Sequence, residues 1–295
     1  MQTADADRFT AFPDLGLSPV LFSAGPFDLR WYSLAYLAGI SVGYLYLIKL
    51  LKQPGAPLGR RHADDLAFYA ALGVFLGGRI GYVLFYNPGH YLSNPLDIVK
   101  VWDGGMSFHG GVAGTSLGLV YFSLKEKLNW LRVHDYVACT VPFGLFFGRL
   151  ANFVNQELWG APTTVAWAIR FQEYNPDLNV LVLGSPRHPT QLYEALLEGI
   201  VLAAILSGMF WKSDARYQPG KLVGAFIFFY GIFRFAIEFV REPDAQFAGT
   251  IVEASGLHMG QWLSLPMILG GLWLMATAKG RRVRVEPTVG GASVA

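Results

Sequence analysis

Apolar residues form seven long stretches along this chain, separated by shorter polar segments. Each stretch approaches the roughly 20 mostly apolar residues that a helix needs to cross a bilayer. Long uninterrupted runs are typical of helices, whereas the strands of a membrane barrel alternate apolar and polar positions. The pattern therefore predicts an all-α polytopic membrane protein with about seven transmembrane helices, at residues 30–51, 66–86, 108–124, 136–155, 191–211, 221–240 and 260–278.

Strand-like alternation is confined to the long connection between the fourth and fifth stretches. Apolar side chains occupy every other position over residues 165–171, and a second short apolar run covers 179–183. The residues between them include Asn175, Pro176 and Asp177, which favour a turn. We therefore expect these two segments to pair as strands in a small mixed or β head.

Lysine and arginine are unevenly distributed over the connections. If the N-terminus lies outside, the inside connections and the tail carry more than twice as many basic residues as the outside segments. Short cytoplasmic loops are enriched in these residues, so we expect the N-terminus outside and the C-terminus in the cytoplasm. We divide the chain into an external N-terminal segment (1–29), a membrane domain (30–278) with an external loop (87–107) and an external head (156–190), and a cytoplasmic tail (279–295).

The composition agrees with membrane insertion and narrows the chemistry. Hydrophobic residues make up 53% of the chain and charged residues only 15%, whereas soluble domains carry about 25% charged residues. The net charge of +2 indicates no nucleic-acid partner. Cys139 is the one cysteine, which excludes a disulfide framework, and no HExxH motif or cysteine cluster indicates a metal site. We expect neither a metal nor a cofactor.

Polar residues interrupt the stretch at 136–155 near its outer end. Arg149, Asn152 and Gln156 follow one another at steps of three and four, so they are expected on one helix face, and Glu157 lies at the external boundary. An arginine in a bilayer costs at least ~2.5–3.5 kcal/mol, so it usually faces a protein interior and binds something anionic. A lipid phosphate is the obvious candidate. The alternative is a snorkelling arginine beside amides that bond neighbouring helices.

A second polar stripe follows the stretch at 221–240. Tyr230, Arg234 and Glu238 are spaced by four residues and Arg241 follows by three, which places all of them on one face. Either Arg234 and Glu238 form a pair that offsets its own insertion cost, or the phenol and the second arginine belong to a binding site.

Other charged residues lie on two further predicted helices. Glu194 and Glu198 share a face, and they either orient the arginines across the bundle or pack as protonated groups. Arg79 either binds a lipid phosphate or pairs with a glutamate, and the sequence favours neither. Gly77 and Gly81 flank Arg79 and are expected to let another helix approach closely.

His109 is the best candidate for proton transfer. It lies among glycines at the start of the stretch at 108–124, and glycines let a substrate approach the backbone closely. The positive end of a helix disfavours the imidazolium form, so the ring is kept able to accept a proton. The alternative is a structural, hydrogen-bonding histidine. Tyr32, at the outer end of the first stretch, is either an interfacial aromatic residue or a phenol of the site.

These residues lie in motifs that resemble one enzyme family. The longest is GRLANFVNQELWG over residues 148–160, and it resembles the signature of the bacterial phosphatidylglycerol–prolipoprotein diacylglyceryl transferases. Shorter motifs similar to the same family follow its order along most of the chain, at residues 78–82, 107–111, 188–194, 234–246 and 259–264.

The resemblance implies an enzyme of the bacterial inner membrane whose active site faces the outer leaflet. It would transfer the sn-1,2-diacylglyceryl group of phosphatidylglycerol to the lipobox cysteine thiol of a preprolipoprotein, form a thioether and release glycerol 1-phosphate. Its partners would be this lipid, the preprolipoprotein signal peptide and the surrounding membrane lipids. The functional positions are then His109, Arg149 and Arg234 for catalysis, and Tyr32, Asn152, Glu157, Gly160, Tyr230 and Glu238 for binding, to which we add Arg79 from its place in the membrane.

Without the resemblance, the same residues leave two other protein classes open. A lipid or anion transporter would line a pathway with its membrane arginines, but it would spread polar groups through both leaflets, whereas here they cluster toward the outer half. A scaffold or receptor would keep internal charge pairs without any reaction. The enzyme interpretation would fail if internal carboxylates occupied the guanidinium groups completely.

Overall fold

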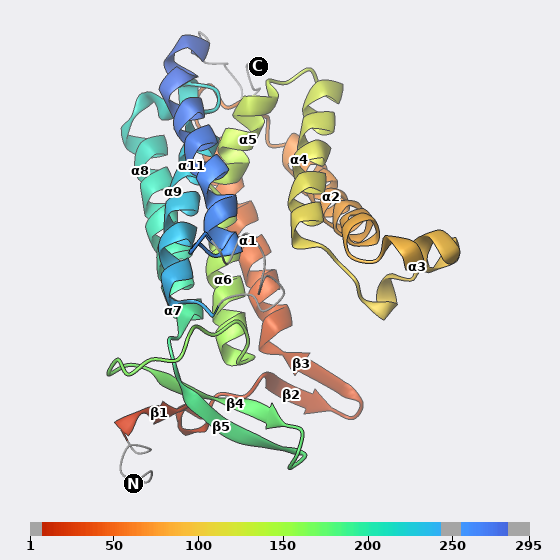
Figure 1. Ribbon diagram of the computed structural model, residues 1–295. Coiled ribbons are helices and arrows are strands. Elements are labelled where there is room, and N and C mark those ends of the chain that lie inside the picture. The colour runs from red at the N-terminus through yellow and green to blue at the C-terminus, as the bar shows by residue number, and fades with distance from the viewer. Residues whose placement is uncertain (1–7, 243–254, 283–295) are drawn as a thin grey trace. The chain divides into compact units, whose positions relative to one another are not determined.

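The computed structural model describes residues 8–242 and 255–282 (Figure 1). Asp244 and Gln246 of the motif at 234–246, and the predicted tail from residue 283 onward, lie outside the described residues. The chain divides into two compact units, each of which is described by itself. Unit 1 comprises residues 1–43, 138–213 and 224–277, and unit 2 comprises 44–137, 214–223 and 278–295.

Long helices follow the predicted apolar stretches closely. The described residues include five helices long and apolar enough to cross a membrane, and a bent pair brings the number to six. The remaining predicted stretch, at 108–124, is helical too, but its glycines, His109 and Lys125 keep its hydropathy below that of the others. The prediction of a mostly helical polytopic membrane protein is therefore confirmed. The single unbroken helices are α1 (Trp31–Leu51), α2 (His62–Phe85), α4 (Phe108–Lys125), α9 (Lys221–Ile237) and α11 (Met259–Thr277).

Two predicted helices are irregular. The stretch at 136–155 is the second part of a pair, α5 (Trp130–Ala138) and α6 (Val141–Val154), which meet at a bend of 40°. Pro142 at the start of α6 explains the break, because proline is tolerated in a first helical turn but cannot continue a preceding helix. The stretch at 191–211 runs through α7 (Thr190–Glu194), a π-helix η5 (Ala195–Val201) and α8 (Leu202–Lys212).

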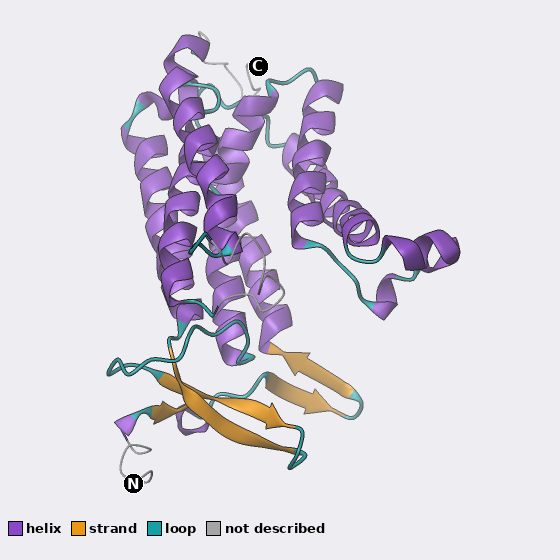
Figure 2. Cartoon of the chain, viewed as in Figure 1, coloured by secondary structure: helices purple, strands orange, loops and turns teal. Residues whose placement is uncertain are grey.

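The predicted head contains the two predicted strands. β4 (Ile169–Asn175) and β5 (Val180–Arg187) pair antiparallel, and β4 begins four residues later than the alternating pattern does. The short strand β1 (Thr10–Ala11) adds to β4 in parallel, giving the order β1-β4-β5. The strands gather at one end of the helices of unit 1 (Figure 2).

The N-terminal segment is part of this head, which the sequence analysis missed. After β1 it forms a 3-10 turn η2 (Phe12–Leu15) and a hairpin of β2 (Val20–Ala24) and β3 (Phe27–Arg30) that leads directly into α1. Phe12 is buried with Phe153, Ile169 and Phe171 in a small aromatic core. Because these strands have two to five residues, their alternation is too short to stand out from the mixed composition of 1–29.

Unit 2 is built around a close pairing of α2 and α4 through glycines. A Cβ atom at Gly77 would meet the carbonyl of Gly110 and lie 2.6 Å from Cα of Gly114. A Cβ atom at Gly81 would lie 2.7 Å from Cα of Gly110. The predicted close helix approach at Gly77 and Gly81 is therefore confirmed, with α4 as the partner.

The predicted external loop at 87–107 is not a simple connection. It folds into three short helical segments between α2 and α4. These are α3 (Pro88–Ser93), η3 (Pro95–Val99) and η4 (Val101–Asp103). Two more single 3-10 turns, η6 (Asp214–Tyr217) and η9 (Ala278–Arg281), complete the described part of unit 2.

Candidate active site

Three arginines and three glutamates of unit 1 form one connected network, which we call the arginine–carboxylate cluster. Arg149 comes from the last turns of α6 and Glu194 ends α7, so two separate helices supply opposite charges. The remaining members lie on η5, on the end of α9, on the 3-10 turn η7 (Glu238–Val240) that follows it, and at the residue directly after η7. The six members are Arg149, Glu194, Glu198, Arg234, Glu238 and Arg241.

Glu194 is the centre of the cluster. Its side chain is fully buried, and its carboxylate contacts three guanidinium groups. Oε2 lies 3.2 Å from Nε of Arg149, and Oε1 lies 2.6 Å from Nη1 of Arg234 and 3.2 Å from Nη1 of Arg241. The expectation that a carboxylate of this helix orients the arginines across the bundle is therefore confirmed for Glu194.

Glu238 contacts two of the three arginines, Arg234 and Arg241. Its Oε1 lies 2.5 Å from Nη2 of Arg234 and 3.5 Å from Nε of Arg241. Its Oε2 lies 3.5 Å from Nδ1 of His258. A Cβ atom at Gly260 would collide with the Glu238 carboxylate, so a glycine is needed at that position.

Glu198 is held more loosely. It is also fully buried, but its one ion pair is a 3.6 Å contact with Nη2 of Arg149. Neither of its carboxylate oxygens has a hydrogen-bond partner among the described residues. The π-helix η5 begins directly after Glu194 and carries Glu198, so its wide turns bring both carboxylates to Arg149; π-turns of this kind are frequent at functional sites.

The arginines keep part of their hydrogen-bonding capacity. The side chains of Arg149, Arg234 and Arg241 are 18%, 20% and 16% exposed, while the carboxylates behind them are at most 6% exposed. The contacts with the glutamates are formed by Nε and Nη2 of Arg149 and by Nη1 and Nη2 of Arg234. The glutamates therefore hold the guanidinium groups from the buried side and leave other N–H groups for an anion.

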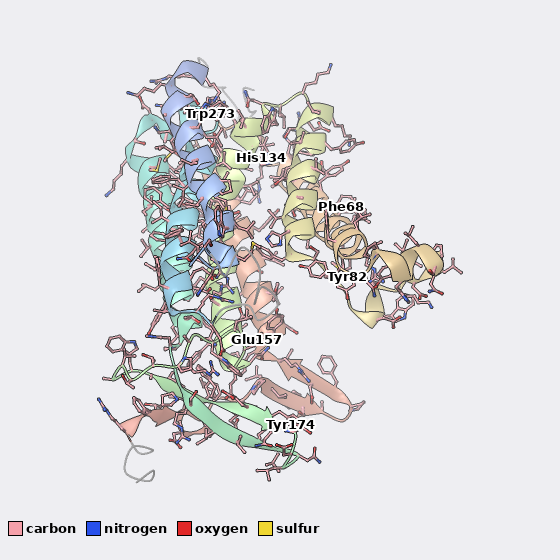
Figure 3. The ribbon with its side chains drawn as sticks, in the orientation of Figure 1. Phe68, Tyr82, His134, Glu157, Tyr174 and Trp273 are labelled. Carbon is pink, nitrogen blue, oxygen red and sulfur yellow. The ribbon has the colours of Figure 1, made fainter. Side chains whose placement is uncertain are left out.

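A strained loop follows α6 and presents Glu157. Gln156 and Leu158 on either side of Glu157 both have positive φ angles, of 54° and 59°, a conformation that is uncommon for residues other than glycine and that clusters at functional sites. Nδ2 of Asn152 donates to the Glu157 carboxylate at 2.8 Å. The side chain of Gln191 holds the loop by donating to the Glu157 carbonyl at 2.7 Å. Figure 3 shows Glu157 at the end of α6 that meets the strands, on the opposite side of unit 1 from Trp273.

Gly160 lies where three backbone segments meet. Its N–H donates to the carbonyl of His188 at 2.9 Å, and it forms an isolated bridge with Arg241. A Cβ atom at Gly160 would lie 2.5 Å from the carbonyl oxygen of Val240 and 2.6 Å from the methyl group of Thr190. No other residue fits there, so Gly160 fixes the backbone that carries Arg241.

Two tyrosines lie close to the cluster. The Tyr230 phenol is near enough to Glu198, Arg149 and Arg234 to interact with their charges. The Tyr32 phenol, at the start of α1, interacts in the same way with Glu157 and Arg149, and its hydroxyl lies 3.2 Å from that of Tyr36. Both predicted phenols therefore lie on the same side of unit 1 as the arginines.

His109 belongs to unit 2, at the second residue of α4. Ser107 caps this helix by accepting a hydrogen bond from the N–H of Gly110 at 3.1 Å, and its own N–H donates to the carbonyl of Gly78 at 2.8 Å. The His109 side chain is exposed and has an edge contact with the Phe108 ring. The structure thus places His109 at a helix N-terminus, as expected from its sequence.

Arg79 contacts backbone carbonyls and pairs with no glutamate among the described residues. It is 5% exposed, and its guanidinium donates to five backbone carbonyls of the loop 87–107. The distances run from 2.5 Å for Gly104 to 3.1 Å for Gly105 and Lys100. Asp97 and Ile98 supply the other two carbonyls. These contacts favour a structural role in shaping the loop, and lipid binding by Arg79 stays a prediction.

The same loop carries an exposed ion pair outside the helices. Nζ of Lys100 lies 2.6 Å from Oδ1 of Asp97, and Nε2 of His90 lies 3.0 Å from Oδ2. The hydrogen bond from Lys100 holds the pKa of Asp97 below its ordinary value.

The prediction that Gln156 shares a helix face with Arg149 and Asn152 is wrong, and the predicted functional positions do not include Arg241 or His258. Helix α6 ends at Val154, and the positive φ of Gln156 turns its side chain to Gln172 of β4, where Oε1 accepts from the backbone N–H at 2.9 Å. Arg241 is one of the two residues of the polar stripe considered for a binding site, but it is not among the predicted functional positions, and its spacing from Glu238 is the signal for their contact. His258 has no local signal, because its partner lies 20 residues earlier in the chain.

The sequence is similar to one family of known proteins over most of its length. The family described as prolipoprotein diacylglyceryl transferase matches residues 19–277. A protein of Erythrobacter litoralis is 52% identical over 93% of this chain and 94% of its own length. A protein of Zymomonas mobilis is 49% identical over 92% and 94%, and one of Rhodospirillum rubrum is 47% identical over 91% and 95%. All three are named phosphatidylglycerol–prolipoprotein diacylglyceryl transferase.

Proposed function

Because this chain belongs to the prolipoprotein diacylglyceryl transferase family, we propose that its arginine–carboxylate cluster binds the phosphate of phosphatidylglycerol during the reaction. The protein is a multi-pass membrane enzyme that transfers the diacylglyceryl group of phosphatidylglycerol to a prolipoprotein. The observation that carries the proposal is the arrangement of the arginines, which are fixed from behind by Glu194 and partly exposed in front.

The reaction has two chemical demands. A cysteine thiol of ordinary pKa ~8.5 is mostly protonated at neutral pH and must lose its proton to become nucleophilic. The sulfur then attacks the C3 carbon of the diacylglyceryl glycerol, a C–S bond forms, and the C–O bond to phosphate breaks. The electron pair of that bond leaves with glycerol 1-phosphate, whose phosphate gains negative charge.

Arg149 and Arg234 answer the second demand. Planar guanidinium groups suit phosphate oxygens, because two N–H groups can donate in parallel. The contacts with the glutamates use Nε and Nη2 of Arg149 and Nη1 and Nη2 of Arg234, so we assign Nη1 of Arg149 and Nε of Arg234 to the phosphate. Donors that are already oriented stabilise the charge that develops as the C–O bond breaks.

His109 answers the first demand by accepting the thiol proton, directly or through a water molecule. It is exposed at the second residue of α4, and a neutral imidazole has a nitrogen that can accept a proton. Asn152, Tyr230 and Tyr32 hydrogen-bond the lipid headgroup, and Glu157 steers its glycerol, with Asn152 holding the Glu157 carboxylate at 2.8 Å. Glu238 fixes Arg234.

The reaction is proposed to take place at the outer leaflet of the bacterial membrane. The cluster lies within the last turns of α6 and α9, at the end of unit 1 that carries the strands. The basic residues of the connections favour an orientation with this end outside.

A defined assay tests the proposed function. Purified enzyme in vesicles that contain phosphatidylglycerol is mixed with a peptide that carries a lipobox cysteine. We expect a thioether-linked diacylglyceryl peptide and one glycerol phosphate for each peptide modified. A peptide with serine in place of the cysteine is the control, and product from the serine peptide, or phosphate release without the thioether, would contradict the proposal.

Replacing Gly160 should uncouple the loop from Arg241. We expect Gly160→Ala to lower kcat about 10- to 100-fold, because a Cβ collides with Val240 and Thr190 and the reacting groups shift. The measurement is the transfer rate beside the melting temperature. Gly208→Ala in α8 is the matched control, since a Cβ there meets nothing within 4 Å, and equal rates for the two variants would contradict the role of Gly160.

A further inference from the structure

The charges around the cluster do not balance if every carboxylate is ionised. Three arginines face three buried glutamates, and a fourth glutamate, Glu157, lies on the loop beside Arg149 and Tyr32. With all four glutamates ionised, the group carries one negative charge more than the arginines supply. An excess of negative charge disfavours the binding of a phosphodiester, and a neutral carboxylate among the four would remove that excess.

The contacts of the four glutamates differ sharply. Glu194 has three guanidinium partners, the nearest at 2.6 Å. Glu238 has two, the nearest at 2.5 Å, and His258 besides. Glu157 accepts hydrogen bonds from two side-chain amides. Glu198 has one arginine at 3.6 Å and no hydrogen bond among the described residues, although it is fully buried.

An ionised carboxylate is strongly disfavoured in a buried place unless partners compensate the loss of water. Glu198 has the weakest compensation of the four, a single arginine contact at 3.6 Å. The groups that face it are Arg149 from α6, Glu194 from α7, Tyr230 and Arg234 from α9, and, farther along the network, Glu238, Arg241, His258, Glu157 and Tyr32.

We propose that Glu198 is kept as a neutral carboxylic acid behind Arg149, while Glu194 is the ionised positioning residue that holds all three arginines. The neutral Glu198 leaves Arg149 with positive charge to give to an anion, and Glu194 sets its direction. This assignment deepens the proposed function, on which it rests, and it divides two adjacent carboxylates of one helical segment into different roles.

The experiment compares two isosteric variants of the full-length enzyme. A glutamine resembles a protonated glutamate, so Glu198→Gln preserves the proposed charge and Glu194→Gln removes one. We expect kcat/KM for transfer to fall at least about tenfold further in Glu194→Gln than in Glu198→Gln, mainly through kcat, because freed arginines lose their orientation. Glu194→Asp should recover part of that loss. Equal losses in the two glutamine variants would overturn the proposal.

An infrared spectrum tests the same assignment without any turnover. The unmodified enzyme should show the carbonyl stretch of a protonated carboxylic acid that Glu198→Gln removes and Glu194→Gln retains. Loss of the band in Glu194→Gln, or its persistence in Glu198→Gln, would overturn the assignment. Because the band is read without substrate, failure of the transfer assay in the unmodified enzyme would refute the proposed function and leave this result to be judged separately. Melting temperatures of both variants identify any that fails to fold. In that case the aspartate variants are compared: Glu198→Asp should shift the band and Glu194→Asp should leave it in place, and the reverse result would overturn the assignment.

Discussion

Arg149→Ala should abolish transfer even when phosphatidylglycerol is in large excess, with kcat lowered by about 10²–10³-fold or more. Arg149 contacts Glu194 and Glu198 through Nε and Nη2, and Nη1 is the donor that we propose for the phosphate. Removing it takes away a donor whose contact strengthens as the phosphate gains charge, so excess lipid cannot compensate. The rate of thioether formation at saturating lipid is the measurement.

Two further variants make this result specific. Arg149→Lys keeps the charge but has a single nitrogen, which cannot reach both glutamates and the phosphate together, so it should recover little activity. Arg30→Ala, at the exposed end of β3, removes an arginine outside the cluster and should leave kcat unchanged. If Arg149→Ala works at near-normal rates, Arg149 does not bind the phosphate.

His109→Gln should lower kcat by about 10²–10⁴-fold, the usual contribution of a general base. Glutamine keeps a hydrogen-bonding side chain of similar reach, but it cannot accept a proton at neutral pH. Phosphatidylglycerol should still bind, because the groups assigned to its phosphate belong to the arginine–carboxylate cluster. Equilibrium binding of the lipid, measured beside turnover, separates the two effects.

His90→Gln supplies the control for this experiment. His90 lies in α3 of the same unit, where it pairs with Asp97 on an exposed surface, and its loss should leave turnover unchanged. Unchanged turnover in His109→Gln would remove His109 from the mechanism. Loss of lipid binding in His109→Gln would instead assign this histidine to the headgroup.

Hydropathy was sufficient to predict most of the helices, because a bilayer demands long apolar runs and few other structures satisfy that demand. It could not predict what happens inside a run. The bend before α6 depends on Pro142, which is visible in the sequence but does not interrupt the hydropathy. The amino-acid composition of η5 does not distinguish a π-helix from an α-helix, because its turns are fixed by contacts with α6 and its neighbours.

The site was predictable to the extent that its residues repeat at helical spacing. Arg234, Glu238 and Arg241 follow steps of four and three, and the structure pairs them as that spacing suggests. Helical spacing could not predict contacts between residues that are far apart in the sequence. The choice of Glu194 over Glu198 as the centre depends on which side chain reaches α9.

Arg79 shows the limit of reading a single charge from sequence. A buried arginine needs acceptors, and the sequence alone names lipid phosphate and glutamate as candidates. Backbone carbonyls of the following loop were the third possibility, and they are the partners in the structure. The turn that brings those carbonyls to Arg79 depends on Gly104 and Gly105, which both have positive φ.

The π-helix has a consequence for how this chain tolerates insertions and deletions. A π-turn holds about one residue more than an α-turn. Losing one residue between Ala195 and Val201 together with the π-turn would keep the register of Glu194 and α8, whereas converting the segment to ordinary α-helix with all seven residues kept would rotate Glu194 by about 100° relative to α8. The lipid-facing surface of α8 would survive that change, whereas the carboxylate would turn away from Arg234. The face that α8 turns to the lipid and the direction of the Glu194 carboxylate are thus set independently. The seven residues of η5 separate the two, although their composition does not differ from that of an ordinary helix.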